Sequence, residues 1–333
     1  MAWLFLLSYW IAAIVIASFF YALWNRGIEP GLRLVGIEQS EEVGPFEGEQ
    51  LRVELTLDAR GRVRGPFHTR LELGGTPIEA GAGLIPKDGY AVEHELPPQR
   101  RGPVTLSGWI SESGDPLGLF VRRSRKQDSE LVLMLPRYAS LHARPLTREI
   151  EASVTAPRAG SGTEVFGVRQ YQPGDALRRI HWRSTARAGE LVVREFEPPG
   201  VQNLGIFLDP NPPTLDAADQ CARLAASEAW DCLRAGGRVT LWAPACEPTR
   251  PDEDRNLLAL LEWLARYPNR AAQDEPPPIV GDAIAVTATS DVRLLDAVED
   301  VRAHGGSVRA WVVGEAELDS DMDTQRAGLT WPL

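Results

Sequence analysis

The sequence predicts a multidomain α+β protein with one N-terminal transmembrane helix, an immunoglobulin-like β-sandwich domain and a doubly wound α/β domain. Three observations predict this organisation. An uncharged apolar run opens the chain, short alternating segments punctuated by glycine and proline follow it, and the last third alternates apolar strands with longer helices. A length of 333 residues exceeds one ordinary core, and 44% apolar residues exclude wholesale disorder.

The first element covers residues 2–24, which carry no charge. At about 1.5 Å per residue, a helix of this length crosses a hydrocarbon core of about 30 Å. Tryptophan and tyrosine lie near both ends, as is typical of membrane interfaces. A cleaved signal peptide is the alternative, but no basic segment precedes the run and no small-residue cleavage site follows it. We therefore expect residues 1–25 to be a membrane anchor.

The orientation of this anchor follows from the flanking charges. Arg26 and Arg33 come after the span, so the positive-inside rule places the soluble domains in the cytoplasm of a single-pass protein. The three cysteines, Cys221, Cys232 and Cys246, are odd in number and do not suggest a disulfide framework. We expect them to be buried free thiols.

Residues 26–136 are expected to form the β-sandwich domain. Apolar and polar residues alternate, and turn signals such as Gly74-Gly75 and Pro97-Pro98 separate the runs. The expected strands cover residues 51–57, 69–73, 91–96, 104–110 and 131–135. Such a domain implies support or binding rather than catalysis.

Residues 199–333 are expected to form the α/β domain. Strands are predicted at 203–208, 238–243, 283–287 and 308–313, and helices at 215–235, 253–266 and 292–303. Alternation of this kind indicates a parallel sheet covered on both faces. Ligands of such sheets bind at the carboxyl ends of the strands, here Asp209 and residues 287–290. Neither glycine-rich phosphate-binding motif follows the first strand, so nucleotide binding has no motif to support it.

The intervening segment, residues 137–198, is locally basic. Pro173-Gly174 suits a type II turn, and Asp175 can cap a helix whose Arg179, Arg183 and Arg187 share one face. Seven arginines against five carboxylates give residues 158–197 a net charge of +2, while the rest of the chain carries −13. Two interpretations stay open: an internal ion-pair network, or a docking face for an acidic partner or an anion.

Several function classes are disfavoured. A net charge of −11 argues against broad binding of nucleic acid. Asp175, His181 and Ser184 fall within one ten-residue stretch without a nucleophile elbow, so a catalytic triad is not favoured. Histidine and cysteine show no zinc-ligand spacing. We therefore expect a protein that is not an enzyme and needs no cofactor.

The run Gly167-Val168-Arg169-x-Tyr171-x-Pro173-Gly174-Asp175, continuing through Trp182 and Gly189-Glu190-Leu191, resembles the signature of the bacterial domain of unknown function 58 family. Arg100-Arg101-Gly102 and residues 115–120 also resemble motifs of that family. The residues expected to bind a partner or to build this segment are Arg169, Tyr171, Pro173, Gly174, Asp175, Arg178, Arg179, Trp182, Arg183, Arg187, Gly189 and Glu190.

The resemblance implies a membrane-anchored bacterial protein whose C-terminal domain is similar to a von Willebrand factor A domain. Such proteins often accompany MoxR-type AAA+ ATPases, and no enzymatic activity is established for them. Family members commonly have two N-terminal spans, whereas this chain shows one. The implied function is a non-enzymatic scaffold or adaptor of the inner membrane that works with a MoxR-type ATPase in assembling or activating other complexes.

The resemblance also implies an alternative, a metal-dependent binding module. Von Willebrand A domains hold Mg²⁺ with D-x-S-x-S after the first strand. The corresponding residues here are Asp209, Asn211 and Pro213, and proline offers no side-chain ligand. Asp209 and Asn211 are thus the candidate metal ligands, and capping of the following loop by Asp209 is the competing interpretation.

Overall fold

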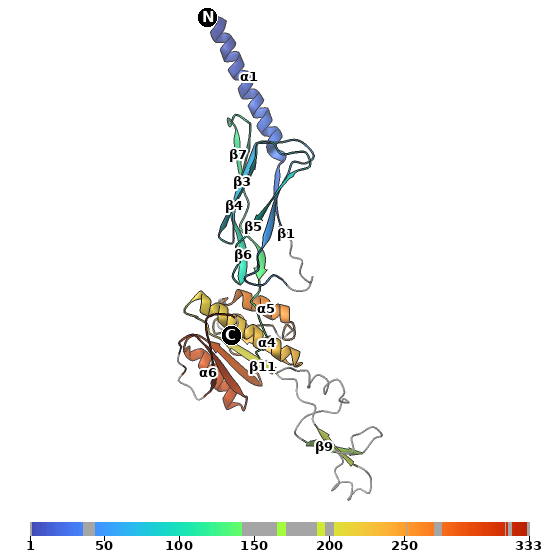
Figure 1. The fold of residues 1–333 in the computed structure, drawn as a ribbon, viewed down its shortest axis with the longest axis vertical. Helices are drawn as coiled ribbons and strands as arrows, with labels where there is room; N and C mark the ends of the chain where they lie inside the picture. Colours follow the sequence, from blue (N-terminus) through green and yellow to red (C-terminus); the bar gives the residue numbers. More distant parts are fainter. Residues whose placement is uncertain are drawn as a thin grey trace. The chain divides into compact units, whose positions relative to one another are not determined.

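The computed structural model describes residues 2–35, 44–141, 203–250, 252–269, 275–316, 318 and 322–331, and the backbone of residues 165–170 and 192–196 (Figure 1). Contacts divide the chain into two compact units. The first comprises Met1–Arg137 together with Leu261–Tyr267, and the second comprises Tyr138–Leu260 with Pro268–Leu333.

The first unit begins with the expected helix. Helix α1 (Ala2–Trp24) has the bounds of the uncharged run, and a short 3-10 turn, η1 (Asn25–Gly27), continues it. Most side chains of α1 are exposed, although nearly all are apolar. The helix is long and apolar enough to cross a membrane.

Two antiparallel sheets follow α1 in the first unit. One contains β1 (Glu29–Val35), β2 (Arg52–Asp58) and β5 (Tyr90–Glu95) in the order β1-β2-β5. The other contains β3 (Phe67–Leu73), β4 (Thr76–Ala82), β6 (Gly102–Gly114) and β7 (Val121–Arg125) in the order β4-β3-β6-β7, and β8 (Ser129–Met134) also pairs with β6. The unit is therefore a sandwich, as the alternating pattern predicts.

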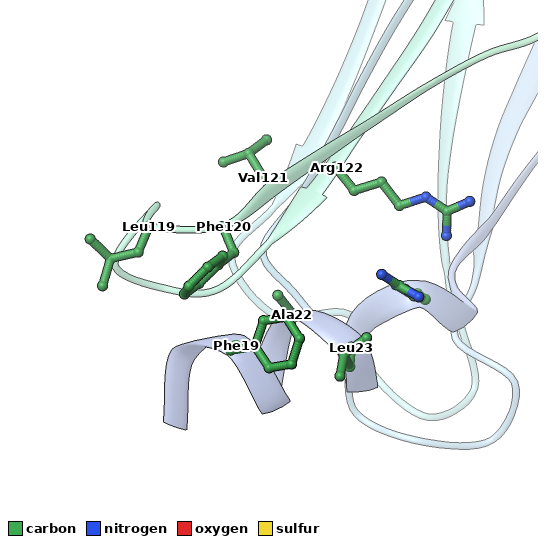
Figure 2. Close-up of a pocket in the computed structure, with 8 residues that line it drawn as sticks. Phe19, Ala22, Leu23, Leu119, Phe120, Val121 and Arg122 are labelled. Carbon is green, nitrogen blue, oxygen red and sulfur yellow. The ribbon is translucent and has the colours of Figure 1, made fainter. Parts of the chain in front are cut away.

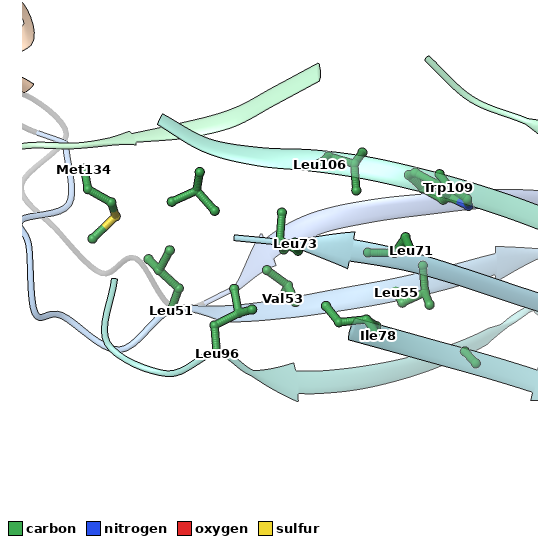
Figure 3. Packing of buried hydrophobic residues seen from close by; sticks show 12 residues of the cluster. Leu51, Val53, Leu55, Leu71, Leu73, Ile78, Leu96, Leu106, Trp109 and Met134 are labelled. Carbon is green, nitrogen blue, oxygen red and sulfur yellow. The ribbon is translucent and has the colours of Figure 1, made fainter. Parts of the chain in front are cut away.

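The sandwich core lies between these sheets (Figure 3). Leu55 of β2, Leu71 of β3 and Trp109 of β6 belong to one buried cluster that both sheets supply. The Trp109 indole N–H donates to the Thr69 hydroxyl at 2.9 Å, so its one polar atom is satisfied inside the core.

Three strands of the sandwich were not predicted. Strand β4 contains Pro77 and Gly81, which argue against a strand by composition, but β4 is an edge strand, where proline is tolerated. Strand β7 is exposed along its whole length and has no apolar alternation to detect. Strand β1 contains Pro30 and Gly31 and pairs only with β2.

The second unit contains a parallel five-stranded sheet in the order β12-β11-β13-β14-β15. Its strands are β11 (Asn203–Leu208), β12 (Arg238–Trp242), β13 (Asp282–Thr287), β14 (Val308–Val313) and β15 (Asp323–Ala327). Helices α4 (Leu215–Arg234) and α6 (Val292–Ala303) belong to this unit. Helix α5 (Leu257–Arg266) begins in it, and its residues from Leu261 onward belong to the first unit. The predicted parallel sheet is confirmed.

Helices α4 and α6 cover opposite faces of this sheet. Leu294 and Val298 of α6 cluster with Ala310 of β14, whereas Glu228 of α4 bonds to Arg309 and Trp311, the neighbours of Ala310 in the same strand. Adjacent strand residues point to opposite faces, so the two helices are on opposite sides. Polar β15 was not predicted, because its only buried residue is Ala327.

Within the basic residues 158–197 the structure describes two strands. Strands β9 (Val165–Gln170) and β10 (Val192–Phe196) pair antiparallel, with Arg169 opposite Val193. The sequence from Leu191 to Phe196 predicts a strand, in agreement with β10, whereas no pattern predicts β9. The helix expected between Asp175 and Arg187 lies outside the described residues.

Candidate functional site

The base of α1 is fastened to the sandwich by a buried asparagine. The side-chain amide of Asn25 donates to the carbonyls of Pro66 and Gly114, each at 2.9 Å, and its oxygen accepts from the Gly65 N–H at 2.8 Å. Asn25, Gly65 and Gly114 are buried, so the Gly65 N–H and the Gly114 carbonyl have little access to water. One side chain therefore joins the end of α1 to the loop before β3 and to the end of β6.

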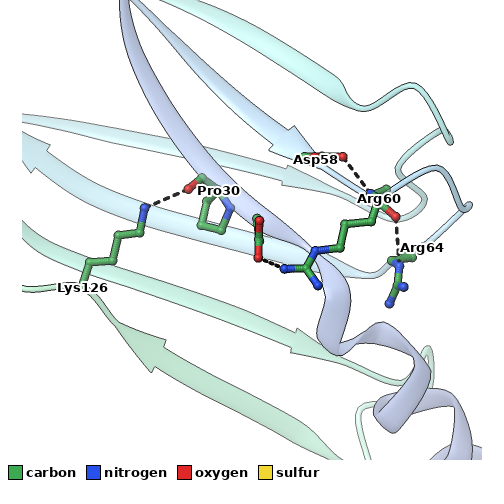
Figure 4. Close-up of polar contacts among 7 residues, drawn as sticks. Pro30, Asp58, Arg60, Arg64 and Lys126 are labelled. Atoms are coloured by element: carbon green, nitrogen blue, oxygen red, sulfur yellow. Dashed lines mark hydrogen bonds and ion pairs between the residues drawn. The ribbon is translucent and has the colours of Figure 1, made fainter.

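Arginines surround the last residue of the helix. The guanidinium groups of Arg62 and Arg64 lie over the Trp24 ring, 4.8 and 5.8 Å from its centroid, and Arg64 also donates to the Trp24 carbonyl. Arg64 is largely buried, and its Nε donates to the Ala59 carbonyl at 3.0 Å (Figure 4). A Cβ at Gly27 would lie 2.5 Å from the Arg64 guanidinium, so a larger residue there would displace this side chain.

The start of β1, which follows this joint, is held by further polar contacts (Figure 4). Lys126 donates to the Pro30 carbonyl at 2.9 Å, and the Arg60 side chain pairs with Glu29. The chain leaving α1 is thus bonded to the sandwich from its first residues.

The loop between β6 and β7, residues 115–120, is a compact hairpin tip. The Asp115 carboxylate accepts the N–H groups of Leu117 and Phe120 at 2.9 and 2.7 Å, and the Gly118 N–H donates to the Asp115 carbonyl at 3.0 Å. Pro116 occupies the second position of this turn, where a fixed φ is favoured. The tip therefore has one internally bonded shape.

This hairpin tip also contacts α1. The Ser18 hydroxyl of α1 bonds to the Asp115 carboxylate, and the Phe19 and Phe120 rings meet edge to face at 5.5 Å between centroids. Desolvation alone would raise the pKa of Asp115, but the hydrogen bonds from Phe120, Leu117 and Ser18 outweigh it and hold that pKa below its usual value. Asp115 therefore stays ionised while it is buried against the helix.

Apolar side chains gather at the same end of the sandwich. We call the loops 59–66, 83–89 and 115–120 the α1 end: Gly65 and Gly114 bond to Asn25, and Arg64 bridges to Ile85. Within the described part of the sandwich, every exposed large apolar residue lies in or next to these loops: Val63, Leu84, Tyr90, Leu117, Leu119 and Val121. Exposed apolar side chains that gather at one end are unusual for a water-facing surface and are typical of an interaction site.

The second candidate site lies at the carboxyl edge of the parallel sheet. Asp209 is fully buried directly after β11. Its Oδ2 accepts the Thr287 and Thr289 hydroxyls at 3.1 and 2.7 Å and the Ala288 N–H at 3.0 Å, while Oδ1 accepts the Asn211 N–H at 2.8 Å. The structure thus brings Asp209 together with the end of β13, as the strand order predicts.

This arrangement does not fit a hard cation well. Two of the groups that face the carboxylate are backbone N–H donors, which cannot coordinate a metal. Thr214, the first hydroxyl residue after Asp209 in the sequence, caps α4 by accepting the Ala217 N–H. The described residues include no group of three or more histidine, cysteine or acidic side chains that could hold an ion. Metal binding by Asp209 and Asn211 stays a prediction.

The arginine-rich candidate residues cannot be placed in this geometry. Tyr171 through Glu190 lie outside the described residues, and Arg169 is described only as a backbone position in β9. The two upstream motifs that resemble the family, residues 100–102 and 115–120, lie among the described residues. The hairpin tip is one, and the other contains Arg101, whose guanidinium donates to the Leu264 carbonyl at 2.8 Å within the first unit.

Two glutamate contacts illustrate how the units are held internally. Glu130 pairs with Arg266 in the first unit, and the hydrogen bond from Arg266 lowers the pKa of Glu130. In the second unit the buried Glu228 accepts from Arg309 and from the Trp311 indole, each at 2.7 Å. Each contact joins two elements of one unit.

The cysteines are buried free thiols, as expected from their number. Burial, with the charge of Glu228 adding to it, raises the pKa of Cys232 to about 11. Cys232 is therefore protonated at neutral pH and is a poor nucleophile.

Comparison with known proteins connects this chain with one family. Residues 167–271 match the model described as protein of unknown function DUF58. The resemblance seen in the signature residues is thereby confirmed for that range, and the hairpin tip and Arg101 lie outside it. The uncharacterised protein YeaD of Bacillus subtilis (strain 168) is 24% identical over 188 residues, which are 51% of this chain and 46% of that protein. The chain thus matches about half the length of this relative.

A solved structure also aligns with part of the chain. It is the CARDB domain of a Pyrococcus furiosus protein in complex with di-metal ions, with 13% identity and coverage of 32% of this chain and 93% of that chain. Its TM-score of 0.21 is too low to indicate a shared fold.

Sequence reasoning missed the residues of the joint. Asn25 carried a weak signal, as an uncharged polar residue between a long apolar run and the first arginine. Ser18 gave none, because a single serine in an apolar helix commonly bonds to its own backbone. The hairpin tip was recognised only as a family motif, although Leu117 and Leu119 within a turn already departed from the polar composition of ordinary turns.

Proposed function

We propose that this protein is a non-enzymatic scaffold anchored in the bacterial inner membrane by α1, with its soluble parts in the cytoplasm. The observation that carries the proposal is the joint between α1 and the sandwich. A helix that only tethered the chain would need no contact with the domain after it, whereas Asn25, Ser18 and Trp24 all bond to the sandwich. The joint fixes the sandwich against the end of the helix, which is a property that suits a scaffold.

The apolar α1 end supports the same proposal. Leu84, Leu117 and Leu119 are exposed at the end from which the helix leaves, where a bilayer would cover them.

A MoxR-type AAA+ ATPase is the proposed partner. The DUF58 match over the basic segment supports this assignment, and the local net charge of +2 suits an acidic docking surface. In this proposal Arg178, Arg179, Arg183 and Arg187 engage the ATPase. The α/β unit would be similar to a von Willebrand factor A domain, in line with its parallel sheet and its helices on both faces.

Affinity purification from native membranes tests the partnership. The tagged full chain, an Arg183→Glu variant and an Arg255→Glu control, which reverses an exposed charge in the second unit, are purified in parallel and analysed by mass spectrometry. We expect an AAA+ ATPase with the wild type and the control, and its loss with Arg183→Glu. Recovery of the same ATPase with Arg183→Glu would contradict the proposed docking face.

The competing hypothesis is a Mg²⁺-dependent binding module at Asp209. It is favoured only by the oxygen-rich surroundings of Asp209, two hydroxyls beside one carboxylate. Calorimetry of the full chain with Mg²⁺ decides it. Binding heat that disappears in Asp209→Ala would support the module, and the scaffold account expects no such heat.

A further inference from the structure

The close-up of the joint shows a cavity between the end of α1 and the hairpin tip (Figure 2). Its volume is about 310 Å³, within the range of small-ligand sites. Phe19 and Leu23 of α1 line one side, and Leu119 and Val121 line the other. Ala22, Phe120, Arg26 and Arg122 complete the lining, so six apolar side chains and two arginines surround the cavity.

These two arginines are available to a ligand. Both are exposed, and neither has a hydrogen-bond or ion-pair partner among the described residues. The neighbouring cations are already engaged: Arg123 donates to Glu112 at 2.7 Å, Arg60 pairs with Glu29, and Lys126 lies over Trp109. The cavity thus has an unneutralised pair of guanidinium groups, which suits a phosphate.

The depth of the cavity identifies the kind of ligand. Phe19 precedes Trp24, the last residue of α1, by five residues, or about 7.5 Å along the helix axis at 1.5 Å per residue. In a spanning helix this stretch crosses the boundary between acyl chains and headgroups, and Arg26 lies just outside it. The apolar walls therefore face the depth of acyl chains, and the arginines face the depth of lipid phosphates.

We propose that this cavity binds one anionic phospholipid, with its phosphate held by Arg26 and Arg122 and the upper part of an acyl chain against Phe19, Leu23, Leu119 and Val121. This inference rests on the proposed membrane anchoring by α1. The contacts of Asp115 with Ser18 and of Phe120 with Phe19 place the hairpin tip directly against the helix, so the two walls of the cavity are joined. The bound lipid completes the contact between the sandwich and the bilayer.

Native mass spectrometry of the full chain, purified in detergent and titrated with phosphatidylglycerol or phosphatidylcholine, tests the site. One basic residue near an anionic membrane surface contributes about fivefold to binding. We therefore expect Arg26→Gln/Arg122→Gln to lose about 25-fold in apparent affinity for phosphatidylglycerol and little for phosphatidylcholine. Arg123→Gln is the matched control, because its guanidinium is engaged with Glu112, and it should bind as the wild type does.

The possible outcomes distinguish a failure of the proposed lipid site from a failure of membrane anchoring. If Arg123→Gln loses as much affinity as the double variant, the attraction is diffuse and the proposed site is wrong. Equal affinity of the wild type for both lipids also overturns it. Alkaline extraction of native membranes containing each variant is the independent readout: release of the wild type from the membrane would refute anchoring itself. Retention of all variants leaves anchoring intact whatever the lipid titration shows.

Discussion

Replacement of Asn25 by alanine is expected to open the joint between α1 and the sandwich. The change removes both amide donors and the acceptor oxygen, and it leaves the Gly65 N–H and the Gly114 carbonyl without a partner in a buried place. The third group, the Pro66 carbonyl, is only partly buried and can recruit water. An unsatisfied buried polar group costs about 1–3 kcal/mol. With two such groups, and some relaxation around them, we expect local opening to become easier by about 2–4 kcal/mol.

Hydrogen exchange of the Gly65 amide measures this opening directly. A free-energy loss of that size corresponds to exchange about 30- to 1,000-fold faster, since 1.4 kcal/mol is a factor of ten. Asn25→Asp, which keeps acceptor oxygens but loses both donors, should lie between the wild type and Asn25→Ala. The control is Ser8→Ala in the same helix, because the exposed Ser8 hydroxyl bonds only to the Phe5 carbonyl.

Unchanged exchange of Gly65 in Asn25→Ala, with the full chain embedded in lipid nanodiscs, would refute the reasoning. It would mean that the helix and the sandwich are held together by contacts other than this asparagine.

Three further predictions concern ionisable groups. The depressed pKa of Asp115 means that its carboxylate stabilises the fold above its unfolded pKa near 3.8, and that this share is lost as the pH falls through the lower folded value. The stability advantage of the wild type over Asp115→Asn should therefore be present at pH 7 and vanish in strong acid, as followed by denaturant unfolding at each pH. Glu228→Ala should destabilise the second unit by about 3 kcal/mol in thermal unfolding, because Arg309 loses its buried partner, whereas Asp300→Ala, at an exposed pair, should cost less than about 1 kcal/mol. Cys232, with a pKa raised to about 11, should react with a thiol reagent roughly 10³-fold more slowly at pH 8 than an exposed thiolate, and its rate should rise about tenfold per pH unit. Fast labelling of Cys232 at pH 8 would show that its thiol is accessible to solvent, which would contradict this prediction.

The elements that sequence alone identified are those whose apolar pattern is set by burial on one or both faces. Helix α6 and strands β11 and β14 have their predicted bounds, because apolar residues occupy every position that contacts the core. Strands β7 and β15 were missed because they lie at sheet edges and bury almost nothing. Backbone hydrogen bonds rather than buried side chains stabilise such strands, and these bonds place little constraint on the amino-acid composition.

The candidate site divides in the same way. The edge with Asp209 was predictable, because the carboxyl ends of adjacent parallel strands meet, and Thr287 and Thr289 do contact that carboxylate. The hydrogen bonds to the Asp209 carboxylate were not predictable, because they depend on the path of the backbone after each strand. The joint was not predictable either, because Asn25 and Ser18 bond to Gly114 and Asp115, which lie far from them in the sequence.

The depth of the hairpin tip in a bilayer tests the central claim, that the α1 end of the sandwich is seated in the membrane. Leu117→Cys in the tip and Glu72→Cys, exposed near the other end of β3, each receive an environment-sensitive fluorophore in the full chain, whose native cysteines are buried. In vesicles whose acyl chains carry bromine, a short-range quencher, we expect strong quenching at position 117 and none at position 72. Equal and weak quenching at both positions would contradict the account.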